Sequence, residues 1–334
     1  MPETRRDITL FVTNYPFNPP DVERLRAALG GATLLLTRGE RELTEALTAH
    51  PETDVASLYM PPDNLLTLAP NLRWLALSSA GADHILRQSW IHEPRLPLIT
   101  TANGVHAIQI SEYVFSAMMT WARRWPALLQ LQAERRWPRG SSAEAVAGRE
   151  LADATLLIVG LGAIGRRVAL LGRAFGMRTV GTRRSVSAGA TDPDVDVIVP
   201  DDQLDTLLPQ ADYVVLAVPS TPETHHLINA ERFQRFKPGA FLVNIARGSI
   251  IEQPALIAAL RDGPLGGAAL DVTDPEPLPA DDPLWSAPNL LLSPHISGRS
   301  PRYGERLADL LIDNIARYRE GRPLRNQVDV ARGY

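Results

Sequence analysis

The sequence of 334 residues contains no cysteine. This absence excludes disulfide bonds, a catalytic thiolate and every metal site with cysteine ligands. An excess of basic residues is also missing, because the formal net charge is −4. The chain therefore provides no broad basic surface for nucleic acid or anionic lipid. What remains, 45% hydrophobic and 22% charged residues without low-complexity tracts, is typical of a soluble globular protein.

Long hydrophobic runs are absent as well. The apolar run at residues 8–13 is too short for the core of a signal peptide and continues into strand-like sequence. No window approaches the length of a transmembrane helix. These absences predict a cytoplasmic protein, and the length predicts two domains.

Strand and helix patterns alternate along the first hundred residues. The strand candidates are residues 8–13, 33–37, 54–59 and 96–103, and the helix candidates are residues 19–29, residues 39–50 and a short helix that ends at residues 71–79. Apolar strands without strict alternation, separated by amphipathic helices, predict a parallel sheet that is covered on both faces.

The second half of the chain repeats this alternation. Residues 105–137 predict one or two long helices, and the Trp- and Met-rich part at 113–125 is more typical of core and subunit interface than of a cofactor box. A new series of strands and helices starts at residue 154 and continues to about residue 294. Residues 300–334 predict an amphipathic helix with a polar end.

The segment "LLIVGLGAIG" places Gly160, Gly162 and Gly165 in the spacing G-x-G-x-x-G, after an apolar strand and at the start of a helix. The first glycine allows a tight turn, the second lets a pyrophosphate approach the backbone, and the third lets the helix pack on the strand. The N–H groups of the helix start, including Ala163 and Ile164, would bind phosphates. The segment predicts a dinucleotide site; a glycine-rich turn without a ligand is the alternative.

The next strand, residues 177–185, ends with Thr182, Arg183 and Arg184. An NAD-binding protein usually has Asp or Glu at this place, where it binds the ribose hydroxyls. A carboxylate would repel a 2′-phosphate, whereas a guanidinium can bind it with paired hydrogen bonds. We therefore expect NADP(H) to be preferred and NAD(H) to be possible. The alternative is that both arginines are merely solvated.

Polar residues end three further strands. Arg247 follows a buried strand, Asp271 and Glu276 follow the next, and His295 follows "NLLLSP". The carboxyl ends of strands in an open parallel sheet line the ligand crevice. If these strands belong to one sheet, an arginine, a carboxylate and an imidazole converge where a nicotinamide would lie.

Taken together, "VGLGAIG", "NIARGSIIEQPAL", "ALDVTDPEPLP", "SPHISG" and the earlier "SSAGADHI" resemble the D-isomer-specific 2-hydroxyacid dehydrogenase family. The motifs occur in the family's order over essentially the whole chain. The resemblance implies an α/β fold of two doubly wound parallel-sheet domains with the active site in the cleft between them. A Rossmann cofactor domain, residues 102–295, would be inserted into a discontinuous flavodoxin-like substrate domain, residues 1–101 and 296–334.

The resemblance also implies catalytic roles that agree with the chemistry of the side chains. Arg247 would bind the substrate carboxylate and help polarise the adjacent carbonyl. His295 would protonate the carbonyl oxygen. Glu276 would pair with His295, favour the imidazolium and fix the orientation of the ring.

Further binding residues are carried over from the family's motifs. The substrate carboxylate would be held by the backbone of Ser79, Ala80 and Gly81, together with Arg247 and His295. Besides the glycine loop, the arginine pair, Arg247 and His295, the cofactor candidates are Val218, Pro219, Thr224, Ile245, Ala246, Asp271, Ser297 and Gly298. For Asp271 a structural capping role is the alternative, and His225 and His226 are more typical of structural residues. No cluster has the spacing of metal ligands, so we expect no catalytic metal.

The expected reaction is reduction of glyoxylate, hydroxypyruvate or a larger 2-oxo acid by NADPH, by a homodimer as is usual in the family. A formate or phosphite dehydrogenase is an alternative on the same fold. The long form of phosphoglycerate dehydrogenase carries a further domain after the tail helix, whereas this sequence stops at Tyr334. A non-catalytic protein that senses dinucleotides, such as a transcriptional corepressor, is the alternative from another class.

Overall fold

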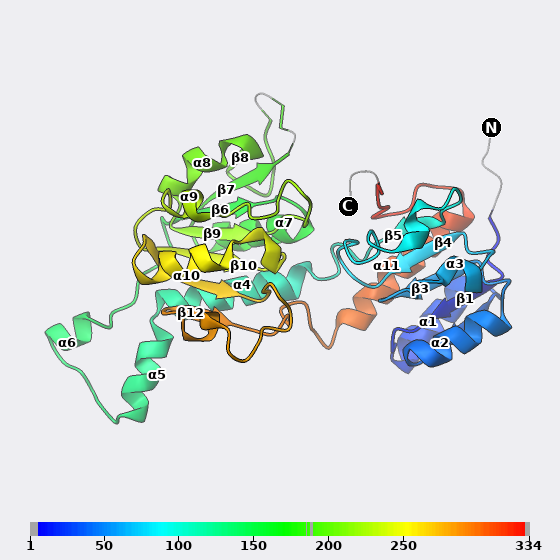
Figure 1. Cartoon of the computed structure of the whole chain (residues 1–334), viewed down its shortest axis with the longest axis horizontal. Helices are drawn as coiled ribbons and strands as arrows, with labels where there is room; N and C mark the ends of the chain where they lie inside the picture. The colour runs from blue at the N-terminus through cyan, green and yellow to red at the C-terminus, as the bar shows by residue number, and fades with distance from the viewer. Residues whose placement is uncertain (1–5, 185, 188–189, 331–334) are drawn as a thin grey trace. The chain divides into compact units, whose positions relative to one another are not determined.

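The computed structural model describes residues 6–184, 186–187 and 190–330 (Figure 1). Residue 185 of the strand predicted at 177–185 and residues 331–334 of the predicted tail lie outside this part. The chain divides into two compact units: unit 1 is Met1–His106 with Arg299–Tyr334, and unit 2 is Ala107–Gly298. The boundaries predicted from the sequence, after residues 101 and 295, fall a few residues before these.

Unit 1 is built on a five-stranded sheet in which all neighbouring strands are parallel. Its strands are β1 (Leu10–Thr13), β2 (Thr33–Leu36), β3 (Val55–Leu58), β4 (Trp74–Leu77) and β5 (Leu98–Thr100). Their order in the sheet is β2-β1-β3-β4-β5. This is the strand order of flavodoxin-like folds, as predicted.

Helices cover both faces of this sheet. They are α1 (Pro19–Leu29), α2 (Gly39–Ala49), α3 (Leu65–Leu68), the 3₁₀ turn η1 (Ser89–His92) and α11 (Tyr303–Arg319). Leu25 of α1 and Leu307 of α11 share one hydrophobic cluster with Phe11 of β1. Leu43 of α2 and Leu65 of α3 share another with the next strand residue, Val12. Successive residues of a strand point to opposite faces, so the continuous apolar strands fill two cores.

The helix predicted to end at residues 71–79 of unit 1 is wrong. Helix α3 ends at Leu68, and Trp74–Leu77 is strand β4. All four residues of β4 are buried, and the strand lies between β3 and β5. A short apolar run of this kind has no period that distinguishes a buried strand from a buried helix.

Unit 2 contains a seven-stranded sheet in which all neighbouring strands are parallel. Its strands are β6 (Thr155–Val159), β7 (Arg178–Arg183), β8 (Val197–Pro200), β9 (Tyr213–Leu216), β10 (Ala240–Asn244), β11 (Leu265–Leu270) and β12 (Leu290–Leu292). The order β12-β11-β10-β9-β6-β7-β8 is the Rossmann order with one strand added. From β6 the strand order proceeds outward in one direction through β7 and β8, and in the other direction through β9 to β12. Ligands bind at such a switch point, here between β6 and β9.

The helices of unit 2 also lie on both faces of their sheet. They are α4 (Ala107–Ala122), α5 (Trp125–Ala133), α6 (Ser141–Glu144), α7 (Ala163–Ala174), α8 (Leu204–Leu207), α9 (Ala230–Phe233) and α10 (Gln253–Arg261), with the 3₁₀ turns η2 (Asp201–Gln203), η3 (Leu208–Gln210), η4 (Gly248–Ile250) and η5 (Pro283–Ser286). Met118 of α4 and Val168 of α7 pack in one core. Phe233 of α9 and Leu256 of α10 pack in the other. Within the described residues, no helix combines the length and the apolar character needed to cross a membrane.

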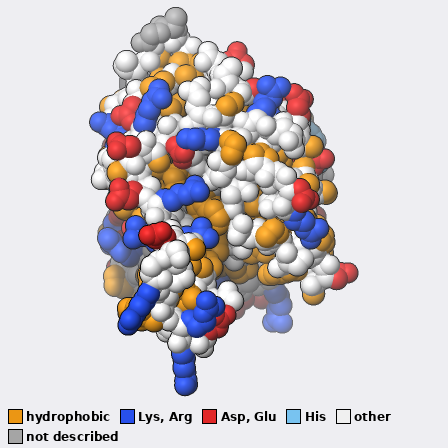
Figure 2. Space-filling view, turned by 90° about the vertical axis from the view of Figure 1, so that its left-hand side faces the viewer, with side chains coloured by type: hydrophobic (Ala, Val, Ile, Leu, Met, Phe, Trp, Pro, Cys, Tyr) orange, Lys and Arg blue, Asp and Glu red, His pale blue; other side chains and the backbone are white. Residues whose placement is uncertain are grey.

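The segment that contains α5 and α6 extends away from the sheet of unit 2 (Figure 1). Helix α5 has no buried residue. Trp125, Leu129 and Trp137 are 50%, 56% and 88% exposed. Figure 2 shows this side of the molecule, where hydrophobic side chains are exposed at the surface among basic ones. The preceding helix α4 does enter the core, as predicted for the Trp- and Met-rich stretch.

Candidate active site

The residues predicted for cofactor and catalysis in unit 2 stand at one edge of one sheet. Each follows, or ends, a parallel strand at its carboxyl end: Gly160 after β6, Thr182 and Arg183 in β7, Val218 after β9, Arg247 after β10, Asp271 after β11 and His295 after β12. Strands β10, β11 and β12 are neighbours. The expectation that the strands carrying Arg247, Asp271 and His295 belong to one sheet is therefore confirmed.

His295 forms a close pair with Glu276. The ring Nδ1 lies 2.6 Å from the Oε1 atom of the carboxylate, and the two side chains are 47% and 39% exposed. The His295 backbone has a φ of 53°, in the left-handed region that few residues other than glycine adopt. Its N–H donates to the Asp271 carbonyl over 2.8 Å. Both the ring and the backbone of His295 are therefore held in a defined orientation.

Asp271 holds the chain on both sides of His295. This aspartate is 1% exposed. Its carboxylate accepts hydrogen bonds from the Ser293 hydroxyl (2.6 Å) and from the N–H groups of Ile296 (2.9 Å) and Ser297 (3.0 Å). The capping role considered for Asp271 is thus present in the structure, whereas a contact with the nicotinamide stays a prediction.

Helix α4 extends this network from the other side. The Tyr113 hydroxyl lies 2.7 Å from the Ser293 Oγ, and the Gln109 amide donates to the Gly298 carbonyl over 3.0 Å. Burial raises the pKa of Tyr113, against the smaller effect of its hydrogen bond with Ser293. The sequence analysis missed both α4 residues. Their spacing of four places them on one face of the helix, and that was the available signal.

Arg247 begins a turn that is fixed by the last residue of β10. Asn244 is fully buried, accepts a hydrogen bond from the Ala246 N–H (3.0 Å) and donates one to the Arg247 carbonyl (2.8 Å). The guanidinium is half-buried, and its Nη1 donates to the Ala246 carbonyl. Ile245 and Ala246 are each 7% exposed and belong to the hydrophobic cores.

The glycine loop has the geometry that a dinucleotide requires. Gly160 has a φ of 99°, and a Cβ atom there would lie 2.7 Å from the Ala217 carbonyl oxygen. A Cβ atom on Gly165 would lie 2.2 Å from the Gly160 carbonyl oxygen, so the helix packs directly on the turn. Gly162, by contrast, borders open space and caps the N-terminus of α7. The N–H groups of the first turn suit a pyrophosphate.

Comparison with known proteins decides the family. Residues 115–297 match the model of the D-isomer specific 2-hydroxyacid dehydrogenase, NAD binding domain. The chain belongs to this dehydrogenase family. It is 34% identical over 254 residues to a glyoxylate reductase of Korarchaeum cryptofilum, which covers 76% of this chain and 75% of the relative. It is 31% identical over 289 residues to glyoxylate/hydroxypyruvate reductase A of Escherichia fergusonii, covering 85% of this chain and 89% of that one.

Solved structures agree with this assignment. The NADPH-dependent glyoxylate/hydroxypyruvate reductase of Sinorhizobium meliloti, in complex with NADP and sulfate, has a TM-score of 0.79 at 26% identity and covers 98% of this chain and 100% of its own. A family member of Xanthobacter autotrophicus, in complex with NADPH and MES, has a TM-score of 0.82 at 28% identity with the same coverage. The protein is thus a 2-hydroxyacid dehydrogenase that binds a nicotinamide dinucleotide. These matches favour the enzyme over the non-catalytic alternative.

In this dehydrogenase the arginine pair is exposed at the end of β7. Each arginine has a carboxylate in its surroundings. Although burial opposes it, hydrogen bonds from the Asp194 N–H and Arg166, the charge of Arg166 and, last, the charge of Arg183 lower the pKa of Asp192. A hydrogen bond from Thr221, together with the charge of Arg184, lowers the pKa of Glu223. A 2′-phosphate at this place would therefore compete with carboxylates for the two guanidiniums.

In the loop after β9, the Thr224 hydroxyl forms its hydrogen bonds with other residues of the same loop. The Thr224 hydroxyl donates to the Pro219 carbonyl over 2.7 Å and accepts from the Thr221 N–H over 2.8 Å. Val218 is half-buried beside the core. The rings of His225 and His226 are exposed and stack on each other at a centroid distance of 4.0 Å. Cofactor contacts by Val218, Pro219 and Thr224 remain predictions.

In unit 1, the predicted substrate loop of the dehydrogenase follows β4. Ser79, Ala80 and Gly81 are partly exposed. The Ser79 hydroxyl donates to the Gly81 carbonyl over 2.9 Å, and the Ser79 carbonyl accepts from the Ala102 N–H over 2.8 Å. The buried Tyr303 hydroxyl donates to the carbonyl of the preceding Ser78. These bonds fix the loop at the carboxyl edge of the sheet of unit 1.

Proposed function

We propose that the dehydrogenase reduces a small 2-oxo acid with NADPH to a D-2-hydroxy acid, with His295 as the proton donor. The observation that carries this proposal is the His295–Glu276 pair at the end of β12, two strands from the turn of Arg247. Relatives named glyoxylate reductase and glyoxylate/hydroxypyruvate reductase A support the choice of substrate class.

Arg247 would bind the substrate carboxylate through two parallel hydrogen bonds and polarise the neighbouring carbonyl. A bound nicotinamide dinucleotide would supply the hydride to the carbonyl carbon. His295 would donate its Nε2 proton to the carbonyl oxygen, so that the ketone becomes a hydroxyl group. Glu276, which contacts Nδ1, would orient the ring so that Nε2 points away from the carboxylate. Its negative charge would stabilise the imidazolium before the proton is transferred.

NADP(H) is our proposed coenzyme. Arg183 and Arg184 stand where a carboxylate would select NAD(H), and both side chains are exposed. The structures from Sinorhizobium meliloti and Xanthobacter autotrophicus, which hold NADP and NADPH, support the choice by similarity. In unit 1, the backbone at Ser79, Ala80 and Gly81 is our candidate for binding a substrate carboxylate.

We further propose that the enzyme is a homodimer in which a second copy covers the segment of α5 and α6. The support is that Trp125, Leu129 and Trp137 are three exposed large apolar side chains of one segment, whose helix α5 has no buried residue. Sedimentation velocity tests this proposal. The wild type should sediment as a dimer, and Leu129→Asp with Trp137→Asp should shift it to the monomer; a monomeric wild type would refute the proposal.

The function is tested by steady-state kinetics with glyoxylate, hydroxypyruvate and phenylpyruvate, each with NADPH and NADH. We expect NADPH oxidation with at least one of these acids. The products of hydroxypyruvate and phenylpyruvate should have the D configuration by chiral chromatography, whereas glycolate, the product of glyoxylate, is achiral. An L product would contradict the assignment of the family reaction. No turnover with any 2-oxo acid would favour a protein that binds the dinucleotide without catalysis.

A further inference from the structure

A pocket of about 290 Å³ in unit 1 is lined by three arginines from separate segments, Arg6, Arg73 and Arg95. The remaining lining residues are apolar or aromatic: Leu72, Leu96, Leu98 and Tyr318. No carboxylate of the described residues belongs to this lining. None of the residues to which the reaction has been assigned lines this pocket.

Sheet topology explains why the three arginines meet. Arg73 directly precedes β4 and Arg95 precedes β5, and these strands are parallel neighbours. Arg6 precedes β1, and its N–H donates to the Arg319 carbonyl at the end of α11 over 3.2 Å. The pocket therefore lies at the amino edge of the sheet. Ser79 is at the carboxyl end of β4, about 20 Å from Arg73 along an extended strand.

The charges in this pocket are not neutralised locally. Within the described part of the chain, none of these three guanidiniums forms an ion pair with a carboxylate. The nearby Asp54 carboxylate is 1% exposed and accepts the N–H groups of Thr9 and Leu10. The Asp54 carboxylate is thus bound by the backbone of the sheet and is shielded from solvent.

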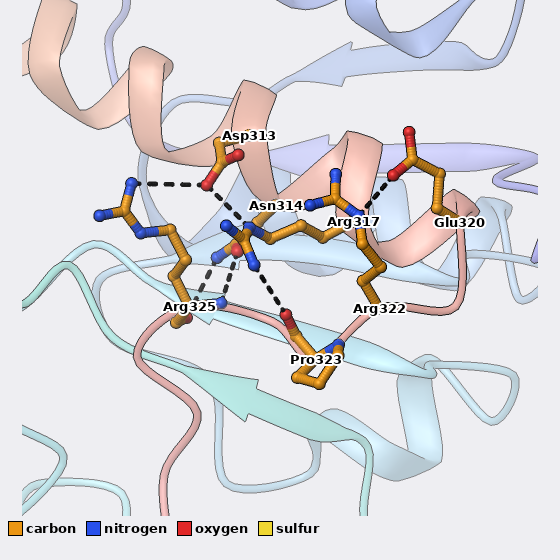
Figure 3. Close-up of polar contacts among 7 residues, drawn as sticks. All are labelled: Asp313, Asn314, Arg317, Glu320, Arg322, Pro323 and Arg325. Atoms are coloured by element: carbon orange, nitrogen blue, oxygen red, sulfur yellow. Dashed lines mark hydrogen bonds and ion pairs between the residues drawn. The ribbon is translucent and has the colours of Figure 1, made fainter.

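The arginines at the adjacent end of α11 behave differently (Figure 3). Arg317 lies 2.9 Å and Arg325 lies 3.5 Å from the Asp313 carboxylate, and Arg322 pairs with Glu320. Three arginines of this neighbouring surface thus have a carboxylate partner, whereas those of the pocket have none among the described residues. Positive charge gathered in a concave site attracts anions.

The floor of the pocket is rigid. Tyr318 is 1% exposed, and its ring stacks on Trp74 with a centroid distance of 5.7 Å. The Trp74 indole N–H in turn donates to the Thr100 hydroxyl over 2.9 Å. The Arg6 guanidinium carbon lies 5.7 Å from the centroid of the Tyr318 ring, at a distance typical of a cation–π contact. An arginine held in this way loses little freedom when it binds a ligand.

We propose that this pocket binds a small organic polyanion, either a phosphate ester or a di- or tricarboxylate. Guanidinium groups bind both kinds of anion through paired hydrogen bonds. The three leucines and Tyr318 provide an apolar wall for the carbon skeleton of the ligand. The size of the pocket is close to that of sites for small metabolites.

The test is isothermal titration calorimetry of the full chain with pyrophosphate and, separately, with citrate. The two arms distinguish a phosphate ligand from a carboxylate ligand. Arg73→Gln with Arg95→Gln removes two of the three charges. Arg235→Gln with Arg261→Gln removes the same charge from exposed positions of unit 2 and is the matched control. A third variant, Arg183→Gln with Arg184→Gln, reports binding of a probe at the proposed site of the 2′-phosphate.

We expect saturable binding of at least one probe to the wild type and at least a tenfold weaker Kd in Arg73→Gln/Arg95→Gln, since charge-assisted hydrogen bonds are lost. The other two variants should retain this binding site. Circular dichroism checks the fold, and Arg95→Gln alone replaces the pair if the pair does not fold. Binding that is unaffected by the pocket variants, that is lost only with Arg183 and Arg184, or that is absent for both probes would overturn the proposal.

Discussion

The Nδ1 atom of His295 lies 2.6 Å from the Oε1 atom of Glu276, although the two residues follow different strands of the sheet of unit 2. Such a hydrogen bond fixes the orientation of the imidazole and leaves Nε2 as the nitrogen that can transfer a proton. The backbone of His295 is separately fixed by its hydrogen bond to the Asp271 carbonyl. The ring and the backbone of His295 are therefore each held by a hydrogen bond.

Glu276→Gln keeps the size of this side chain and removes its charge. We expect kcat for 2-oxo acid reduction to fall about a hundredfold, because the ring loses its orienting carboxylate during proton transfer. The Kd for NADPH, measured by fluorescence titration, should not change. Wild-type kcat in this variant would show that the pair has no role in the reaction.

Arg247→Lys keeps the positive charge and removes the forked geometry of the guanidinium. A lysine cannot form the two parallel hydrogen bonds to a carboxylate. We expect the KM for the 2-oxo acid to rise at least about tenfold, with a lower kcat, because the carbonyl is also less polarised. Arg41→Lys, at a side chain that is 90% exposed in unit 1, is the control. Equal kinetics in both variants would argue against a substrate contact by Arg247.

Replacing Arg183 and Arg184 together with glutamine should raise the KM for NADPH far more than the KM for NADH. Only NADPH carries the 2′-phosphate that the guanidiniums would bind. The measurement is a pair of cofactor saturation curves at a fixed 2-oxo acid concentration, with Arg235→Gln/Arg261→Gln, at exposed positions of unit 2, as the charge-matched control. A similar rise for both cofactors would refute the proposed NADP(H) preference.

Asp271→Asn and Tyr113→Phe perturb the network around His295 to different degrees. The buried Asp271 carboxylate accepts three side-chain or backbone hydrogen bonds, whereas Tyr113 contributes one hydroxyl contact. We expect Asp271→Asn to reduce the free energy of unfolding by about 3 kcal/mol and Tyr113→Phe by about 1 kcal/mol. Urea unfolding measures both. The reverse order would show that the network is not centred on Asp271.

Local signals in the sequence predicted much of the fold. Helix α1 has the predicted bounds, Pro19–Leu29, because Asn18 caps its start and Gly30 ends it in the left-handed conformation. The edge of the sheet that carries Gly160, Arg247 and His295 could also be predicted, because parallel strands place their carboxyl ends together.

Contacts between distant residues could not be predicted in the same way. The Tyr113–Ser293 contact joins residues 180 positions apart, and the pocket of Arg6, Arg73 and Arg95 joins three strand starts. No local period or capping signal specifies such long-range contacts. They depend on the order of the strands and the packing of helices on the sheet. For strand β4 even the local signal was ambiguous, because its four apolar residues fit both a buried strand and a buried helix.

The most direct test of the account is His295→Asn, in which NADPH affinity and turnover are measured on the same preparation. Asparagine can keep a polar contact at this place but cannot donate a proton as an imidazolium does. The account predicts an unchanged Kd for NADPH and a kcat for 2-oxo acid reduction that falls at least about a hundredfold. Turnover within a few-fold of the wild type, with NADPH bound normally, would contradict the assignment of His295 as the proton donor.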